Sequence, residues 1–305
     1  MIALLALAMA PVDLPAAGWV AFDAPAVAGT RRIGCDADGR ASLADDDIDW
    51  NTGDDGEGGP HSQFTVYIEM RAGEPWQLRA YTPDCNVADA KRARQIELGS
   101  GKAVGLLSGW LEVSRSREFE AVLIGALAHI DDAAASAALA EIAADVRDED
   151  RSQDALFWLA LRRGVQGRNI VIEHTGARWP LPHREQAVMA LALSGNPDAL
   201  AVVRGIARAA EPAPLRAQAV MALGITDAPG ALADLHSIFL VDEDRGVREN
   251  AIFAMSQLDN PEAARILEDI IRQPRYGELR RAALFWLVQM DSGEAAVDDL
   301  MREIL

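Results

Sequence analysis

Histidines, cysteines and clustered carboxylates are the side chains of this 305-residue chain best suited to catalysis or metal binding. The histidines show no metal-ligand spacing, and the sequence has no His-Glu-x-x-His, Gly-x-Ser-x-Gly or phosphate-loop motif. Gly99-Ser-Gly-Lys102 lacks the first glycine of a phosphate loop and predicts a turn. We therefore expect no enzyme activity, no catalytic residue, no cofactor and no metal site. The histidines are His61, His129, His174, His183 and His236.

An acidic segment, residues 36–57, carries nine carboxylates and a single arginine. Asp47, Asp49 and Asn51 place oxygen donors at alternate positions, as a calcium loop does. An EF-hand, however, needs Gly sixth and Glu twelfth, where this sequence has Thr52 and Gly58. The segment can be a solvated acidic loop or a looser calcium site, and its Gly and Asp content favours the first.

The only two cysteines, Cys35 and Cys85, have no neighbouring Cys-x-x-Cys or His pattern suited to zinc. We expect a disulfide that closes a loop of about fifty residues and stabilises the fold by roughly 3 to 4 kcal/mol. The alternative is a pair of free, buried thiols in a cytosolic protein.

Residues 2–10 form an apolar run of the length of a signal-peptide core, too short to span a bilayer. We interpret residues 1–17 as a signal peptide and expect a periplasmic or secreted protein. No Lys or Arg precedes the run, and Pro11 follows the small-x-small pattern Ala8-Met9-Ala10. The alternative is therefore a short buried helix.

Strand patterns occupy residues 18–102, which we predict to be a small β-rich region. Residues 64–71 and 76–82 alternate apolar with polar side chains around the turn residues 72–75, which predicts a hairpin. Residues 19–22 and 94–98 add two short strands. We expect a small antiparallel sheet that the disulfide fastens.

Composition limits the partners. The chain has 29 Lys and Arg against 47 Asp and Glu, a formal charge of −18. Nucleic-acid binding needs clustered cations, and anionic membranes attract the same residues, so neither is an expected partner. No other stretch is long and apolar enough to be transmembrane. Eight units of the net charge come from residues 36–57, so the absence of a basic stripe carries this argument.

From about residue 118 onward the sequence repeats every 32 residues. A leucine column runs through Leu127, Leu159, Leu191, Leu223, Met255 and Leu287, and alanines recur at 155, 187, 219, 251 and 283. A second alanine column at 199, 231, 263 and 295 precedes further apolar positions. Each repeat therefore holds two amphipathic helices.

The turns between these helices repeat as well. Pro197, Pro229 and Pro261 follow Asn196, Ala228 and Asn260, an arrangement typical of a helix N-cap followed by proline. An arginine opens the first helix of successive repeats, and these arginines are Arg184, Arg216, Arg248 and Arg280. Ser152 occupies the same position in an earlier copy.

One helix pair cannot bury its apolar face alone, so the copies must stack. We predict a mainly α fold: an α-solenoid of about six 32-residue helix pairs over residues 103–305, after the β-containing region.

Units such as residues 247–255 followed by 259–263 resemble short HEAT-type repeats, a variety also found in phycobilin lyases. The resemblance covers roughly residues 118–305 and implies the fold more than the function. In similar repeats the arginine is structural and bonds the turn of the neighbouring unit. The resemblance implies that role for the four arginines of this ladder.

Residues 165–178 are irregular, because two glycines, a β-branched run and Pro180 oppose a regular helix. A functional interpretation makes His174, Arg178 and Trp179 a binding site at a break in the solenoid. We favour the alternative, a decayed repeat with a looser helix, because single His and Trp residues usually pack or lie exposed without chemistry.

We expect a monomeric, exported, non-enzymatic scaffold that binds another protein through the second helices of successive repeats. The alternative is a cytosolic tetrapyrrole or phycobilin lyase-like enzyme or chaperone, and a nucleic-acid-binding solenoid of the alkylpurine-glycosylase kind is opposed by the charge. The candidate protein-binding residues are Arg204, Arg208, Arg265 and Arg272.

Overall fold

The computed structural model of the chain describes residues 12–36, 38–44, 50, 59–227, 229–258, 260–293 and 297. Its packing divides the chain into two compact units, residues 1–163 and residues 164–305. The predicted boundary at residue 102 separates strands from helices, whereas this division falls within the helical part. The predicted signal-peptide core lies outside the described residues.

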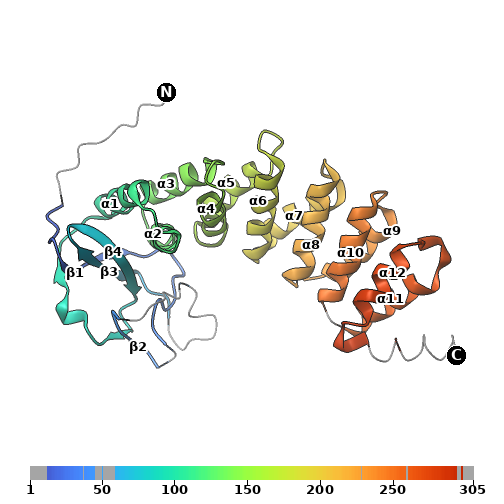
Figure 1. Cartoon of the computed structure of the whole chain (residues 1–305), viewed down its shortest axis with the longest axis horizontal. Helices are drawn as coiled ribbons and strands as arrows, with labels where there is room; N and C mark the ends of the chain where they lie inside the picture. The colour runs from blue at the N-terminus through green and yellow to red at the C-terminus, as the bar shows by residue number, and fades with distance from the viewer. Residues whose placement is uncertain are drawn as a thin grey trace. The chain divides into compact units, whose positions relative to one another are not determined.

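A four-stranded sheet forms the N-terminal part of the first unit (Figure 1). Its strands are β1 (Gly18–Pro25), β3 (Gln63–Arg71), β4 (Glu74–Tyr81) and β6 (Arg94–Gln95), in the order β4-β3-β1-β6. The predicted hairpin is confirmed as β3 and β4, which pair antiparallel. The antiparallel prediction is wrong at one edge, because β6 runs parallel to β1. Strands β2 (Arg40–Ala41) and β5 (Asn86–Val87) form a second, two-stranded ladder.

The hairpin turn needs only two residues. Ala72 and Gly73 both have positive φ, at 52° and 85°. This is the backbone of a two-residue turn whose twist matches that of the strands. Glu74 and Pro75, which the sequence pattern assigns to the turn, belong to β4 instead.

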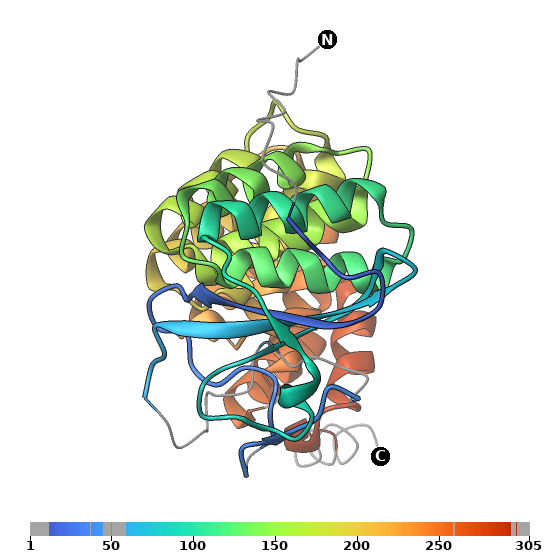
Figure 2. The same cartoon turned by 90° about the vertical axis from the view of Figure 1, so that its left-hand side faces the viewer.

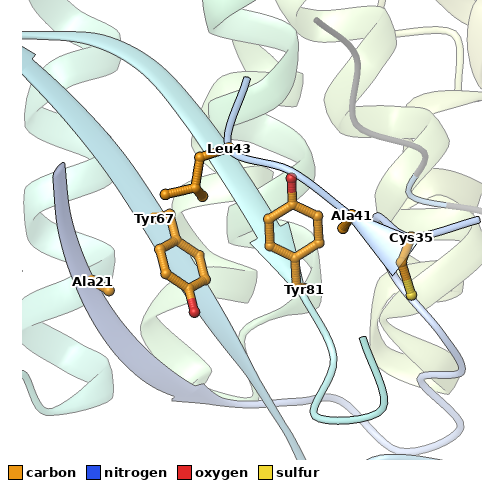
Figure 3. Packing of buried hydrophobic residues seen from close by; sticks show 6 residues of the cluster. All are labelled: Ala21, Cys35, Ala41, Leu43, Tyr67 and Tyr81. Atoms are coloured by element: carbon orange, nitrogen blue, oxygen red, sulfur yellow. The ribbon is translucent and has the colours of Figure 1, made fainter. Parts of the chain in front are cut away.

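Each face of the sheet is covered. Helices α1 (Ser100–Val113) and α2 (Arg117–His129) lie across one face, as Figure 2 shows. On the other, Tyr67 and Tyr81 pack with Leu43, Ala41 and Cys35 in a small core (Figure 3). The predicted Cys35–Cys85 disulfide is present at this core. It joins the segment before β2 to the segment after β4.

The remaining helices alternate as first and second members of pairs. The first unit adds α3 (Ala133–Ala144) and α4 (Glu149–Arg162). In the second unit α6, α8, α10 and α12 pack side by side (Figure 1). The helices of that unit are α5 (Gly164–His174), α6 (Leu181–Leu193), α7 (Pro197–Ala209), α8 (Ala213–Ile225), α9 (Ala231–Val241), α10 (Arg245–Gln257), α11 (Pro261–Arg272) and α12 (Leu279–Leu287).

The 32-residue period matches the buried core. Every member of the leucine column from Leu127 to Leu287 has no exposed surface, and the alanine column from Ala155 to Ala283 is buried as well. The prediction of a mainly helical solenoid with a small N-terminal sheet is therefore confirmed. None of the helices in the described part of the chain is long and apolar enough to cross a membrane.

The predicted caps hold in two of three repeats. Pro197 and Pro261 open α7 and α11, and Asn196 and Asn260 accept hydrogen bonds from the first-turn amides. Helix α9 begins later, at Ala231 after Gly230, whose φ is 78°. The capping prediction is therefore wrong at Pro229.

The prediction that residues 165–178 form no regular helix is also wrong in part. Helix α5 spans Gly164–His174, despite Gly167 and the β-branched run, whereas Gly176, the second of the two glycines, follows the helix. Its Gly167, Val171 and His174 are buried. The segment becomes irregular only after His174, where a turn leads to Pro180 and α6.

Candidate functional site

His129, at the end of α2, is fully buried in an aromatic cluster of the first unit. Its ring stacks on Trp50 at 4.9 Å and meets Phe64 and Trp158 edge-on. Nδ1 lies 2.8 Å from the Gly125 carbonyl oxygen, which assigns the proton to Nδ1. Burial, with the charges of Arg162 and Arg163, lowers the pKa of His129 to about 3. The ring is therefore neutral at physiological pH and fastens Trp50 to α2.

His174 and His183 form a buried pair in the second unit. Nδ1 of His174 lies 2.6 Å from Nε2 of His183, and the Trp179 ring stacks on His174 at 4.3 Å. Burial lowers the pKa of both histidines, that of His174 to about 4. The structure thus brings together all three residues of the functional interpretation: Trp179 stacks on His174, and the Arg178 guanidinium lies 5.1 Å from the centre of the Trp179 ring. His183 is a fourth member of this cluster.

This arrangement fastens the end of α5 to the start of α6. Within the described residues, no group of three or more His, Cys, Asp or Glu side chains is arranged to hold a metal ion. The remaining histidines lie elsewhere: His61 is 3.0 Å from Asp84 in the β-rich region, and His236 is half-buried on α9. Most of the acidic segment examined for calcium lies outside the described residues.

The arginine ladder has one recurring geometry. Nε of Arg184, Arg248 and Arg280 donates to the carbonyl oxygen nine residues earlier, at 2.5 to 3.0 Å. That carbonyl stands at the end of the preceding second helix or in the turn after it, where backbone acceptors lack intrahelical partners. Arg216 differs: it donates to the Ala210 carbonyl, and its Nε and Nη2 hold Asp242 at 2.8 and 3.1 Å. These contacts are consistent with the structural role that the resemblance implies.

Ser152 makes the same contact without a charge. Its hydroxyl donates to the Ala143 carbonyl oxygen, again nine residues earlier, at 2.7 Å. The ladder therefore continues through this repeat with a different side chain. The adjacent Arg151 instead bonds the buried carboxylate of Glu120, and this bond outweighs burial and lowers the pKa of that carboxyl.

The four arginines predicted to bind a partner all have internal carboxylate partners. Arg204 and Arg208 of α7 both pair with Asp234 of α9, so they join neighbouring second helices. Arg272 pairs with Glu268 on its own helix, and Arg265 lies 3.6 Å from Glu262. Arg265 is the most exposed of the four, whereas the side chain of Arg204 is only 23% exposed. This geometry therefore does not favour the four arginines as contacts for a partner.

A groove lies where α7 and α9 end, and sequence reasoning missed it. Its volume is about 440 Å³, and its walls include Ala209, Ile238 and Val241. Leu240 and Val241 at the end of α9 are 51% and 74% exposed. The signal in the sequence was the apolar pair Leu240-Val241, at repeat positions where α7 has Arg208 and Ala209.

Comparison with known proteins supports the repeat assignment. A family model for HEAT repeats matches residues 179–244 and 206–287. No curated protein matches the chain significantly. Among solved structures, human deoxyhypusine hydroxylase in complex with glycerol is 15% identical, covering 64% of this chain and 83% of that one, with a TM-score of 0.31.

A second similar structure is the complex of CpcE and CpcF of phycocyanin lyase from Nostoc sp. PCC7120. It is 19% identical, covers 63% of this chain and 77% of that one, and has a TM-score of 0.34. Likeness at this level does not bear on activity. The repeat period and the stacked helix pairs agree with the family match, and residues 179–287 consist of HEAT-type repeats.

Proposed function

We propose that this chain is an exported, non-enzymatic scaffold that binds another protein through the second helices of its HEAT-type pairs. The observation that carries the proposal is the surface at the ends of α7 and α9, where a groove adjoins the exposed side chains of Leu240 and Val241. Exposed apolar side chains beside a groove are a feature of protein-binding surfaces. Successive second helices of a solenoid provide such surfaces in series.

The proposed location rests on the disulfide. Cys35 and Cys85 are bonded inside a packed core, and such bonds persist in oxidising compartments. The mass of the intact protein from its native source, measured under non-reducing conditions, tests this. Removal of the N-terminal segment together with loss of two hydrogens supports export. An intact N-terminus with two free thiols favours the cytosolic lyase-like alternative.

Site-specific photo-crosslinking tests the binding surface. A photoreactive amino acid at Ser237, an exposed position of α9 that lines the groove, is expected to capture a discrete partner in the native cell. The matched control is the same photoreactive amino acid at Arg281, an exposed position of α12, which is the first helix of its repeat. Equal capture at both positions, or none at Ser237, contradicts the proposal.

A further inference from the structure

The groove at the ends of α7 and α9 has a definite polarity. Three apolar residues line it, Ala209 from α7 and Ile238 and Val241 from α9. Val241 is 74% exposed, and its neighbour Leu240 is 51% exposed. Ile238 is only 3% exposed, so Ala209 and Val241 form the accessible part of this apolar wall, which can contact an aliphatic side chain or the methylene stem of a longer one.

The two arginines of the groove are already engaged. Arg216 is bonded through two nitrogens to Asp242, and its side chain is only 12% exposed. Arg208 pairs with Asp234, which also holds Arg204. An incoming carboxylate would have to compete with these intramolecular partners, so the groove is poorly suited to an acidic group.

The two glutamates of the groove are much less engaged than Asp242. Glu211 is 83% exposed and makes a single surface ion pair, with Arg216. Glu243 is exposed, and no ion pair of Glu243 is found within the described part of the chain. The two glutamates stand 32 residues apart, at the same position of successive repeats. They lie just beyond the C-terminal ends of α7 and α9, whose helix dipoles also favour a cation.

We propose that this groove binds a segment of a partner protein that presents a lysine or arginine beside an apolar residue. The inference rests on the proposed function and deepens it by naming the partner chemistry. The apolar residue and the aliphatic stem contact Ala209 and Val241, and the cationic group lies between Glu211 and Glu243. The glutamates, and not the arginines predicted from the sequence, are thus the charged contacts of this groove.

Peptide titration of the full chain, followed by amide chemical shifts, tests this inference. The probe is an N-acetylated, C-amidated heptapeptide, Gly-Ser-Val-Lys-Val-Ser-Gly. Three companion peptides carry arginine, norleucine or glutamate in place of the lysine. We expect shifts confined to residues 208–216 and 237–243 with the lysine and arginine peptides, and weaker binding of the norleucine and glutamate peptides.

Matched variants separate a specific site from bulk charge. Glu211→Gln with Glu243→Gln is expected to raise the Kd of the lysine peptide about three- to tenfold, as loss of two exposed ion pairs does. Val241→Ser should weaken binding as well. Glu262→Gln with Asp269→Asn on α11 removes the same charge from another exposed surface and should change the Kd less than twofold.

Several outcomes overturn the inference. Equal weakening by the control pair shows attraction to net charge alone, and tighter binding of the glutamate peptide shows an anion site. Shifts outside the groove, or no binding of the lysine peptide at millimolar concentration, also contradict it. Self-association that Val241→Ser abolishes identifies a second copy as the occupant. If the Glu211→Gln, Glu243→Gln variant leaves the Kd of the lysine peptide unchanged while crosslinking at Ser237 still captures a partner, this inference fails and the scaffold function stands.

Discussion

At the scale of single residues, the repeats use two chemistries for one structural task. The carbonyl at the end of a second helix needs a donor, and either an arginine guanidinium or the Ser152 hydroxyl supplies it from nine residues further on. The serine is fully buried, whereas the arginines remain partly exposed. A buried hydroxyl satisfies the acceptor without burying a charge.

Replacement of Ser152 by alanine tests this account. Ser152→Ala leaves the Ala143 carbonyl without its donor, so the free energy of unfolding should fall by about 1 to 2 kcal/mol. Ser237→Ala, at an exposed position, should change it by less than about 0.5 kcal/mol. Urea unfolding measures both. Equal changes in the free energy of unfolding for the two substitutions would show that the Ser152 hydrogen bond does not stabilise the fold.

The buried histidines make stability depend on pH. The pKa of His129 is lowered to about 3 and that of His174 to about 4, mainly by burial, against about 6.5 in the unfolded chain. Below pH 6.5 the unfolded state therefore binds protons that the folded state does not, and stability falls as pH falls. Each of these two histidines should lower the free energy of unfolding by about 2 kcal/mol between pH 6.5 and pH 5.

Urea unfolding at pH 5, 6, 7 and 8 checks this expectation. His129→Gln should make the dependence between pH 6.5 and 5 shallower, because the contribution of His129 is lost and that of His174 remains, while most carboxylates stay ionised. His236→Gln, the matched loss of a half-buried imidazole outside both clusters, should leave the dependence unchanged. A slope that is the same in His129→Gln and in the unmodified chain contradicts the argument.

Residue roles were predictable only where they repeat. The positions of the ladder arginines follow from the 32-residue period. The carboxylates that bind arginines do not, because Asp234 and Asp242 lie 26 to 30 residues after their arginine partners, a spacing that the period does not predict. The same limit applies to His174 and His183. Nothing in their spacing indicates a pair, since the turn at Trp179 brings them together.

At the scale of elements, packing overrides local propensity in α5. Gly167 weakens a helix by roughly 1 kcal/mol relative to alanine, and Gly167 and Gly176 together opposed the helix in sequence reasoning. In the structure α5 packs against α6 and α7, and its end is fastened by the histidine pair. Tertiary contacts of this kind commonly decide a marginal helix. The period was the better guide, because it continues through the segment without insertion.

Two glycines in neighbouring helices give opposite expectations for the same substitution. A Cβ at Gly224 of α8 would lie 2.6 Å from the Ala254 carbonyl oxygen of α10, whereas one at Gly205 of α7 meets nothing within 4 Å. Gly224→Ala should lower the free energy of unfolding by about 1 to 3 kcal/mol, because α8 and α10 must separate. Gly205→Ala should raise it by about 0.5 to 1 kcal/mol through helix propensity.

Thermal and urea unfolding of both glycine variants provide the comparison. Both glycines belong to the same compact unit, so the sign of the change in the free energy of unfolding decides between the two expectations. Stabilisation by both substitutions would mean that α8 and α10 pack less closely than the structure shows.

At the scale of the whole molecule, the 32-residue period predicted the stacked helix pairs. It could not predict that the chain divides into two compact units. Six leucine-column residues spaced by 32 were enough to indicate stacked helix pairs. In the first unit the sheet contacts α1 and α2, and Trp50, in the segment between β2 and β3, packs on Gly125 and His129. No repeat encodes these contacts or the division at residue 163.

The disulfide should therefore act on one unit and not on the other. Cys35→Ser with Cys85→Ser opens a loop of 50 residues, which should lower the stability of the first unit by about 3 to 4 kcal/mol on the chain-entropy estimate. Amide hydrogen exchange resolves the effect by region. Protection should fall in β1, β3 and β4, whose outer face packs on Cys35 through Tyr67 and Tyr81, and stay unchanged in α8 and α10. Equal loss in α8 and α10 would show that the two units unfold as one, whereas unchanged protection in the strands would show that the tyrosine core holds without the bond.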